Sequence, residues 1–478
     1  MKIFRLHLCS FLILVALGAS SAVFSGLPAG YQFETVALPP GAVTLLGICH
    51  KDAKTTAVTT WEGEVWQHAD GVWTRLAEGM MDPLGIHYDR EEGAYYVAQK
   101  PELTRLGDTD GDGSADLFET HTSGFGYSGD YHEYNFGPVS DSMGRKYAVL
   151  NLGAEQGPHV RGDHRDGPAW SYMKYSAPWR GWVYRSDRAG HFHPFATGFR
   201  SPAGIGMSPK DELFITDNQG DWMPVCGMFF VREGGFHGHP SGLGGHPGFG
   251  VDALNKIRAE DFAEDLRRLP AIWFPYNIIS RSPGSPVWDT TDGKFGPFGG
   301  QIFVGDQSMS HIFRCGLEWI GEEYQGWCIN FADRTDSGPV NMAFDASGEL
   351  WIAQVGRGWS SKGKARTGLQ TLRWDGRTIP FEIHSVSLTP KGFRLTFTRP
   401  IKLGQDLVLA LPELESWTYN YWSKYGSDRV EKKRHAVGKH TLSEDRKTLE
   451  IEAPLVAGKV FEITFKNLNA EDGTPLVN

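Results

Sequence analysis

The stretch DTDGDGSADLFE at residues 108–119 has the residue types and spacing of a calcium-binding loop. Calcium is a hard cation that takes roughly six to eight oxygen ligands, so it favours closely spaced carboxylates, and a central glycine permits the sharp turn. The flanking residues predict a strand and a glycine-rich turn instead of two helices that could swing open in a sensor. We therefore predict a structural calcium site that fixes the segment leading to His132. Its candidate ligands are Asp108, Asp110, Asp112, Ser114 through its carbonyl, Asp116 and Glu119.

A second group of polar residues stands at the ends of predicted strands. YHEYNFGP places His132 before one strand, FRSP places Arg200 before another, and TDNQGDW supplies Asp217, Asn218 and Asp221 after a strand. An imidazole has a pKa near the working pH and suits proton transfer, so these residues are candidates for catalysis if the strand ends meet. Structural interpretations remain open: His132 could bond a backbone carbonyl, and Arg200 could tie neighbouring sheets together.

Other conspicuous residues have both a functional and a structural interpretation. His237 and His239 in GGFHGHP could bind a metal or could belong to a tight turn beside Pro240. The long polar and aromatic segment 161–182 is typical of a substrate loop over a site. Trp170, Trp179, Trp182 and Trp222 could be sugar platforms or packing residues.

The first residues predict a secretory signal peptide. Lys2 and Arg5 precede an apolar run from Leu6 to Leu17, and small residues end at Ala22. An uncleaved anchor is the alternative, but the run is short for a membrane span, and no later stretch predicts one. We expect residues 1–22 to be removed and the protein to be periplasmic or secreted. N-terminal sequencing of the exported protein should find a start near Val23.

The composition limits the partners and the redox chemistry. Lys and Arg total 47 against 57 Asp and Glu, the formal net charge is −10, and no basic run occurs, which argues against nucleic acid and anionic membranes. Neither CxxCH nor CxxC occurs, so neither covalent haem nor a zinc ribbon is indicated. An exported protein can form disulfides, and Cys315 and Cys328 are close enough in sequence to pair.

Short apolar and aromatic segments, separated by Gly, Pro, Asp and Asn, predict strands throughout the chain. Similar segments start at Asp82, Ser201 and Ser337, looser copies start at Tyr134 and Ser285, and PPGAVTLLGICHKDAKTTAVTTWEG near the N-terminus is another. About six such units predict an all-β fold, with a six-bladed β-propeller over residues 23–378. A large mixed sandwich is the alternative. One surface helix is expected at 251–270.

From Pro380 onwards apolar residues alternate with polar ones, as at Phe393, Leu395 and Phe397. This period of two predicts a small antiparallel β-sandwich, similar to immunoglobulin or fibronectin type III domains, over residues 379–478. No cluster of chemically active residues occurs in it, so we interpret it as an accessory domain that packs on the propeller or contacts a partner.

The segments WRGWVYR, ATGFRSPAGIGMSPKDELFITDNQGDW, VREGGFHGHP and FVGDQSMSHIFRC resemble the glucose and sorbosone dehydrogenase-like propellers, the fold of soluble quinoprotein sugar dehydrogenases. DASGELWIAQVGRGWSSKGK and FEIHSVSLTPKGFRLTFT resemble exported dehydrogenase-like proteins of planctomycete-like bacteria. The resemblance implies an oxidoreductase that oxidises a sugar or polyol with pyrroloquinoline quinone and calcium. It also implies a periplasmic electron acceptor such as a cytochrome c.

The resemblance assigns roles to individual residues. His132 matches the family's catalytic base, and Arg200 matches the arginine that polarises the quinone oxygens. Gly220 matches the turn whose carbonyl helps to hold calcium under the quinone.

The chain also departs from the family pattern. Ser201 stands where an asparagine contacts the quinone, GDQSMSHIFR lacks the family's lysine, and Arg334 is slightly out of register with an arginine pair that binds the cofactor carboxylates. Losing such cations would cost a tricarboxylate several charge-assisted hydrogen bonds. Two alternatives therefore stay open, because fold does not determine function. One is a cofactor-free carbohydrate-binding or scaffold propeller, and the other is a lyase or hydrolase that uses His132.

Overall fold

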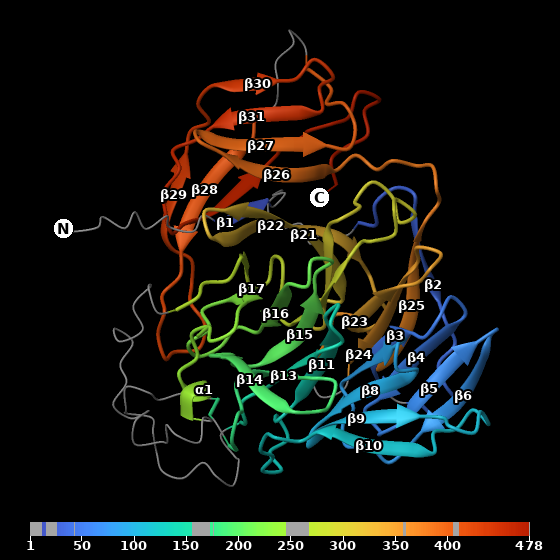
Figure 1. Cartoon of the computed structure of the whole chain (residues 1–478). Coiled ribbons are helices and arrows are strands. Elements are labelled where there is room, and N and C mark those ends of the chain that lie inside the picture. Colours follow the sequence, from blue (N-terminus) through green and yellow to red (C-terminus); the bar gives the residue numbers. More distant parts are fainter. Residues whose placement is uncertain are drawn as a thin grey trace.

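The computed structural model describes residues 12–15, 26–42, 44–154, 173–174, 176–244, 267–356, 360–404 and 411–477. Within these residues nearly all regular structure is β, and the helix is the single short turn α1 (Ser241–Gly244). Figure 1 shows a propeller with two smaller sheets above it. The all-β prediction is therefore confirmed.

In the described residues, six four-stranded antiparallel sheets form the blades of the propeller. Their inner strands contact one another in the closed order β3, β7, β11, β15, β19, β23 and back to β3. The ring closes because the early strand β2 pairs with β25 and completes the last blade. From inner to outer strand, the blades are β3 (Leu45–His50), β4 (Thr55–Thr60), β5 (Val65–Ala69) and β6 (Val72–Ala77); β7 (Gly85–Asp89), β8 (Ala94–Gln99), β9 (Glu102–Gly107) and β10 (Leu117–Thr122); β11 (Asn135–Ser140), β12 (Lys146–Leu150), β13 (Trp182–Ser186) and β14 (Phe192–Thr197); β15 (Pro202–Met207), β16 (Leu213–Asp217), β17 (Cys226–Val231) and β18 (Ile272–Phe274); β19 (Pro283–Trp288), β20 (Ile302–Asp306), β21 (His311–Ile320) and β22 (Glu323–Asp333); β23 (Gly338–Phe344), β24 (Leu350–Val355), β25 (Thr367–Trp374) and β2 (Tyr31–Thr35).

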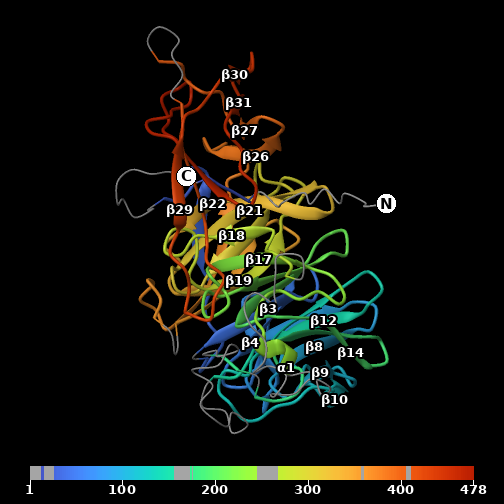
Figure 2. The same ribbon diagram turned by 90° about the vertical axis from the view of Figure 1, so that its left-hand side faces the viewer.

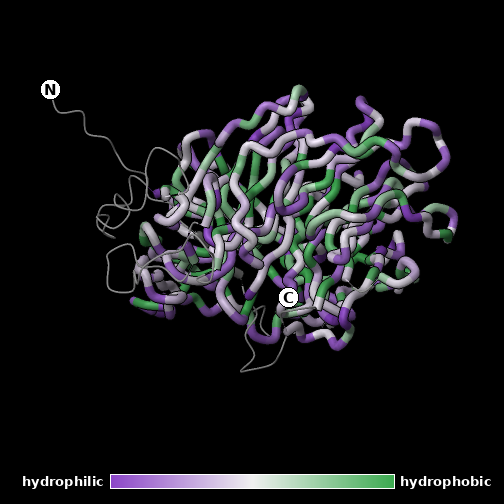
Figure 3. Tube along the Cα trace, turned by 90° about the horizontal axis from the view of Figure 1, so that it is seen from below, coloured by the Kyte–Doolittle hydropathy of each residue, from purple (hydrophilic) through white to green (hydrophobic). Residues whose placement is uncertain are grey.

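The repeated sequence segments correspond to the two inner strands of each blade, because each of them contains a turn between an inner strand and the next one. Buried aliphatic and aromatic residues of neighbouring blades pack together, as Val149, Ile205 and Phe214 do. In Figure 3, hydrophobic stretches of the tube lie mostly inside the molecule, and many of the projecting loops are hydrophilic. The predicted six-bladed propeller is confirmed, and the mixed sandwich is wrong.

Glycines on the inner strands allow neighbouring blades to approach closely. A Cβ atom on Gly85 would lie 1.9 Å from the carbonyl oxygen of Gly137 on the next inner strand. A Cβ on Gly204 would likewise lie 2.2 Å from the carbonyl oxygen of Gly284. A side chain at these positions would push the inner strands apart, so these glycines are a packing requirement of the ring.

The C-terminal region forms two facing sheets, which confirms the predicted sandwich (Figures 1 and 2). Phe393, Leu395, Phe461 and Ile463 are fully buried between them. One sheet contains β26 (Ile383–Thr389), β27 (Gly392–Phe397), β31 (Thr448–Glu452) and β30 (His440–Leu442). The other contains β1 (Leu12–Val15), β32 (Val460–Thr464), β28 (Glu413–Thr418) and β29 (Val430–His435).

The C-terminal sheets are firmly joined to the fifth blade. Trp327 and Ile329 of β22 belong to the same buried cluster as the sandwich core. Arg314 of β21 is fully buried, lies 3.5 Å from the Glu382 carboxylate and packs over the ring of Phe298 at 4.5 Å. The sandwich is therefore held in a defined position relative to the propeller.

The cysteines correct one expectation from the sequence. Cys49, Cys226, Cys315 and Cys328 are all free thiols. Cys315 and Cys328 face each other in register on β21 and β22, but they form no disulfide. Burial raises the pKa of both thiols well above the usual value.

Several expectations concern residues that the structure leaves undescribed. The signal peptide prediction covers 1–22, of which only β1 is described, and the predicted helix at 251–270 falls mostly outside the described ranges. The predicted substrate loop 161–182 is described only from 173, with residue 175 excepted. Among the described helices, none is long and apolar enough to span a membrane.

Candidate functional site

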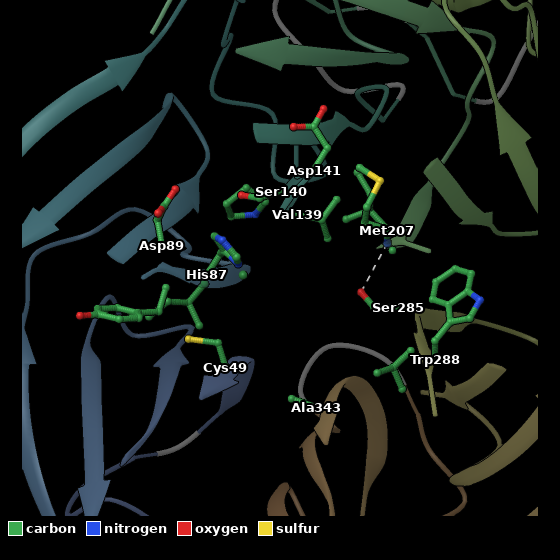
Figure 4. A pocket seen from close by; sticks show the side chains of 18 of the residues that line it. Cys49, His87, Asp89, Val139, Ser140, Asp141, Met207, Ser285, Trp288 and Ala343 are labelled. Atoms are coloured by element: carbon green, nitrogen blue, oxygen red, sulfur yellow. Dashed lines mark hydrogen bonds between the residues drawn. The ribbon is translucent and has the colours of Figure 1, made fainter. Parts of the chain in front are cut away.

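Two cavities lie at opposite ends of the inner strands. The larger one, about 770 Å³, is lined by the ends of β7, β11 and β15 (Figure 4). Its acidic groups are already paired, because Asp89 lies 2.5 Å from Lys146 Nζ and Asp141 lies 2.6 Å from Arg145 Nε. Burial, reinforced by the charge of Lys146, lowers the pKa of His87 there to about 4. None of the residues that the sequence suggested for catalysis lines this cavity.

The second cavity, of about 400 Å³, lies where the inner strands begin, and it brings His132, Arg200 and Ser201 together. These residues precede β11 and β15, so the propeller places them on neighbouring blades. The lining is aromatic and mostly uncharged. Its members are Leu46, Trp61, Leu84, Tyr131, His132, Tyr134, Phe136, Asn151, Met173, Arg200, Ser201, Ala203, Asn218, Gln219, Tyr276, Arg281, Ser282, Gly284, Gln307, Ser308, Val340, Val355 and Tyr425.

His132 is held as a neutral imidazole with one nitrogen available. Its Nδ1 lies 3.2 Å from the carbonyl oxygen of Leu152, which can only accept, so Nδ1 carries the proton. Nε2 is therefore the basic nitrogen, and it lies 3.4 Å from Ser201 Oγ. Burial lowers the pKa of His132 to about 4, the Leu152 carbonyl opposes this change, and the charge of Arg200 adds to it.

Arg200 is buried at the wall of the cavity by a salt bridge. Its Nε donates to Asp221 Oδ1 at 2.7 Å, and Asp221 Oδ2 lies 3.1 Å from His239 Nε2. A Cβ atom on Gly220 would lie 2.0 Å from the guanidinium carbon, so glycine is required beneath Arg200. Burial lowers the pKa of Arg200, but the charge of Asp221 and its hydrogen bond outweigh burial and raise it overall.

Asp217 organises the backbone around Arg200. Its carboxylate accepts the backbone N–H groups of Arg200 at 2.7 Å, Ser201 at 2.8 Å and Asn218 at 2.7 Å. Burial raises the pKa of Asp217 to about 6, although these hydrogen bonds work in the opposite direction. Asp217 thus positions three residues of the lining while its own carboxylate stays engaged.

The segment that carries His132 is held by charged groups on neighbouring elements. Asp130 Oδ1 accepts from the backbone N–H of His132 at 2.8 Å, and Lys100 Nζ donates to the Tyr131 carbonyl at 2.9 Å. Arg180, which is fully buried, donates to the carbonyls of Gly126 at 2.9 Å and Tyr134 at 3.0 Å. These bonds perform the role that we had expected of the acidic loop.

Two amide oxygens point to the kind of ligand that the cavity suits. The side-chain Oδ1 atoms of Asn151 and Asn218 are buried and have no hydrogen-bond donor among the described residues. Both residues line the cavity, beside the exposed rings of Tyr131, Tyr276 and Tyr425. Unpaired acceptors next to aromatic walls suit a ligand that carries several hydroxyl groups.

The other predicted cofactor residues have mixed outcomes. Ser201 lines the cavity, whereas Gly220 does not, and the Gly220 carbonyl accepts the backbone N–H groups of Gly426 at 2.9 Å and Met223 at 3.3 Å. Arg334 is exposed and does not line the cavity. The second cation of the described lining is Arg281, which sequence reasoning missed.

Two of the missed residues had signals in the sequence. Arg281 begins RSP immediately before an inner strand, as Arg200 does in the preceding blade. Asn151 occupies the polar position that ends the second strand of a repeated segment, as Asn218 does one blade later. Tyr425 comes from the C-terminal region and has no such positional signal.

The histidine pair and the described tryptophans among the predicted sugar platforms lie away from the cavity lining. His239 bonds Asp221, while His237 stacks on Phe199 with ring centroids 4.6 Å apart, and burial lowers the pKa of His237 to about 3. In the described residues neither histidine belongs to a cluster of three metal-ligating side chains. Trp222 is buried and neither Trp179 nor Trp182 lines the cavity; Trp170 is outside the described residues.

The acidic loop brings together part of the predicted calcium ligand set. Carboxylate oxygens of Asp108, Asp110 and Asp112 lie within 4.8 Å of one another. Asp108 also accepts the backbone N–H groups of Gly111 at 2.8 Å and Gly113 at 3.0 Å. The exposed aspartates are therefore gathered by turns of the loop backbone.

Two of the remaining predicted ligands, Asp116 and Glu119, are engaged elsewhere. Asp116 accepts from the backbone N–H of Thr109 at 2.8 Å, and Glu119 lies in β10, where Arg105 is 3.2 Å away. Ser114 donates its N–H to Asp112 at 2.7 Å. The loop joins the antiparallel strands β9 and β10, so it lies at the opposite end of this hairpin from the segment that carries His132. It does not clamp that segment, contrary to our expectation.

Comparisons with known proteins bear on the fold. No protein-family model matches the chain, and no curated protein matches it. The PQQ domain of pyranose dehydrogenase from Coprinopsis cinerea aligns at 10% identity with a TM-score of 0.53, covering 75% of this chain and 100% of that one. An oxidoreductase described as a glucose dehydrogenase from Thermus thermophilus aligns at 14% identity with a TM-score of 0.52, covering 72% and 100%. A carbohydrate-active enzyme of Family AA12 from Trichoderma reesei aligns at 12% identity with a TM-score of 0.51, covering 75% and 100%. The chain thus shares the propeller fold of sugar dehydrogenases.

Proposed function

We propose that the cavity containing His132 and Arg200 is the active site of an oxidoreductase that acts on a sugar or polyol. The observation that carries this proposal is the pair of unpaired buried oxygens, Asn151 Oδ1 and Asn218 Oδ1, in a tyrosine-lined cavity whose described lining has no carboxylate. An unpaired buried acceptor costs roughly 1–3 kcal/mol. A ligand with several hydroxyl donors relieves that cost, whereas an acidic ligand does not.

The arrangement suits oxidation of an alcohol to a carbonyl. His132 Nε2 would accept the hydroxyl proton, and a bound quinone would supply a two-electron acceptor for the hydride of the same carbon. Arg200, at the wall of the cavity, would favour negative charge that builds up on a bound acceptor. In an exported protein, a cytochrome c would be the expected partner that takes the electrons onward.

Pyrroloquinoline quinone with calcium does not fit the described donor set. Its three carboxylates need several cations, but the described lining offers Arg200, which is already paired with Asp221, and the exposed Arg281. The Gly220 carbonyl, expected to hold calcium, is occupied by two backbone N–H groups. A quinone with little charge matches this lining better.

Turnover and binding assays test the proposal. Purified protein is titrated with a panel of aldoses and polyols by calorimetry and is then assayed for reduction of uncharged quinones. Parallel assays contain pyrroloquinoline quinone and calcium. Sugar binding with quinone reduction supports the oxidoreductase. Binding without turnover in any assay favours the second candidate, a carbohydrate-binding propeller, because the aromatic and mostly uncharged lining would also suit a bound sugar. Absence of both overturns the proposal.

Calcium is proposed only for the acidic loop. A cation that binds the native state alone stabilises it by mass action, so we expect millimolar calcium to raise the melting temperature by a few degrees. Replacing both Asp108 and Asp112 by alanine should remove that increase, because it removes two of the three clustered carboxylates. Replacing Asp375, an exposed aspartate outside the loop, by alanine is the control. Identical melting curves in calcium and in chelator would show that the loop is only an acidic turn.

A further inference from the structure

The connection between β28 and β29 leaves the C-terminal sandwich and lies on the propeller. This segment, residues 419–429, is called the C-terminal arm below. Figure 1 shows it as the orange-red segment that descends from β28 and β29 along the left side of the propeller. The sequence WTYNYWSKYG at 417–426 makes it unusually aromatic for a surface connection.

The arm is fixed to the propeller by backbone hydrogen bonds. Trp222 N donates to the Trp422 carbonyl at 2.9 Å, and Gly426 N donates to the Gly220 carbonyl at 2.9 Å. Ser427 N donates to the Pro224 carbonyl at 2.8 Å. These bonds reach residues 220–224, which contain Asp221, the partner of Arg200.

Side chains make the same contact specific. The rings of Tyr421 and Trp222 lie 5.1 Å apart, and the Arg267 guanidinium lies 4.0 Å from the Tyr421 ring. Gly426 has a positive φ of 64°, and a Cβ there would lie 2.8 Å from the Gln219 side chain. Glycine is therefore needed where the arm passes closest to the propeller.

The arm places Tyr425 in the wall of the candidate active site. Tyr425 lines the cavity, its ring centroid lies 5.3 Å from the Arg200 guanidinium carbon, and 62% of its surface is exposed. No protein group among the described residues hydrogen-bonds its hydroxyl. The backbone next to Tyr425 is anchored, but its ring is exposed and its hydroxyl has no protein partner among the described residues. Tyr425 is therefore better placed to contact a ligand than to stabilise the fold.

We propose that Tyr425 is a specificity-determining residue of the sugar site, supplied by the C-terminal region. Its ring packs against the less polar face of the sugar or polyol, and its hydroxyl exchanges a hydrogen bond with the ligand. The C-terminal region thus completes the active site and is more than an accessory domain. This inference rests on the proposed function, because it assigns the ligand of that same cavity.

The test measures the affinity of the full-length protein for a sugar that binds the wild type. Tyr425→Ala is expected to raise Kd about tenfold, which corresponds to about 1.4 kcal/mol. The melting temperature should stay nearly unchanged, because the ring is exposed. Tyr425→Phe separates the two contacts: retained affinity assigns the effect to the ring, and lost affinity assigns it to the hydroxyl. Phe118→Ala is the matched control, since Phe118 is 52% exposed and lies outside the cavity lining.

Two outcomes would overturn the inference, and they are distinguishable. A wild-type protein that binds no sugar in the panel removes the proposed function and the inference with it. A wild-type protein that binds sugar, with Tyr425→Ala binding it equally well or Phe118→Ala binding it equally poorly, removes the inference alone.

Discussion

Replacing His132 by alanine is expected to lower kcat for sugar oxidation by about a hundredfold or more, because a positioned base is worth roughly that factor. The Leu152 carbonyl accepts the Nδ1 proton, so Nε2 is the nitrogen that takes up a proton, and alanine removes it. The fold should survive, since the segment is held by backbone hydrogen bonds to Asp130 and Arg180. Steady-state kinetics with a quinone acceptor measures the effect.

The pH profile links this loss to the imidazole itself. The pKa of His132 is lowered to about 4, mainly by burial, so the base stays neutral down to that pH and kcat/KM should fall only near pH 4. The alanine variant should lose that limb of the profile. His87→Ala is the control, because burial lowers the pKa of His87 to about 4 as well, but His87 lines the opposite cavity. Wild-type turnover in His132→Ala would return His132 to a structural role.

Replacing Arg200 by methionine is expected to damage both stability and activity. Asp221 is 1% exposed, so without Arg200 its carboxylate stays buried after losing its charged partner at 2.7 Å, while His239 Nε2 at 3.1 Å and the Met173 N–H at 3.2 Å remain beside it. Breaking a buried ion pair in this way costs about 3–5 kcal/mol. We therefore expect the melting temperature to fall by several degrees and turnover to fall by about a hundredfold, because a charge beside the reacting oxygens is lost.

A double variant separates the two effects. Arg200→Met with Asp221→Asn should recover much of the lost stability, since no uncompensated charge remains, but it should not recover turnover. Arg314→Met is the matched control, because Arg314 on the fifth blade is also buried and paired, in its case with Glu382. Arg314 does not line the cavity, so this variant should lose stability while its folded fraction keeps normal kcat. If the double variant is no more stable than Arg200→Met, the buried charge is not the cause.

The repeated segments predicted the propeller because each blade uses the same local pattern of strand, turn and strand. Glycine recurs at Gly85 and Gly204 because neighbouring inner strands touch at these positions. The same contact between blades therefore leaves the same residue type in these two repeated segments. The alternation at Phe393 and Leu395 similarly predicted the sandwich, since successive residues of a strand face opposite sides of its sheet.

The acidic loop shows the limit of reasoning from spacing. Asp108, Asp110 and Asp112 do come together, because they lie within one short turn. Glu119 does not join them, because strand pairing with β9 places it opposite Arg105. Ligand spacing in the sequence therefore predicts which side chains meet only where the residues stay within one turn. Residues that belong to a strand are positioned by the pairing of that strand instead.

Local periodicity and the residues at strand ends were enough to predict the blades, the sandwich and the candidates His132, Arg200 and Ser201. The packing of the sheets was needed to show that Asp221 pairs with Arg200 and that the Gly220 carbonyl accepts two backbone N–H groups. It also brought Tyr425 to the cavity across more than 200 residues of sequence from Arg200. Such contacts depend on how separately folded sheets pack against each other, and no local pattern of residues encodes that packing.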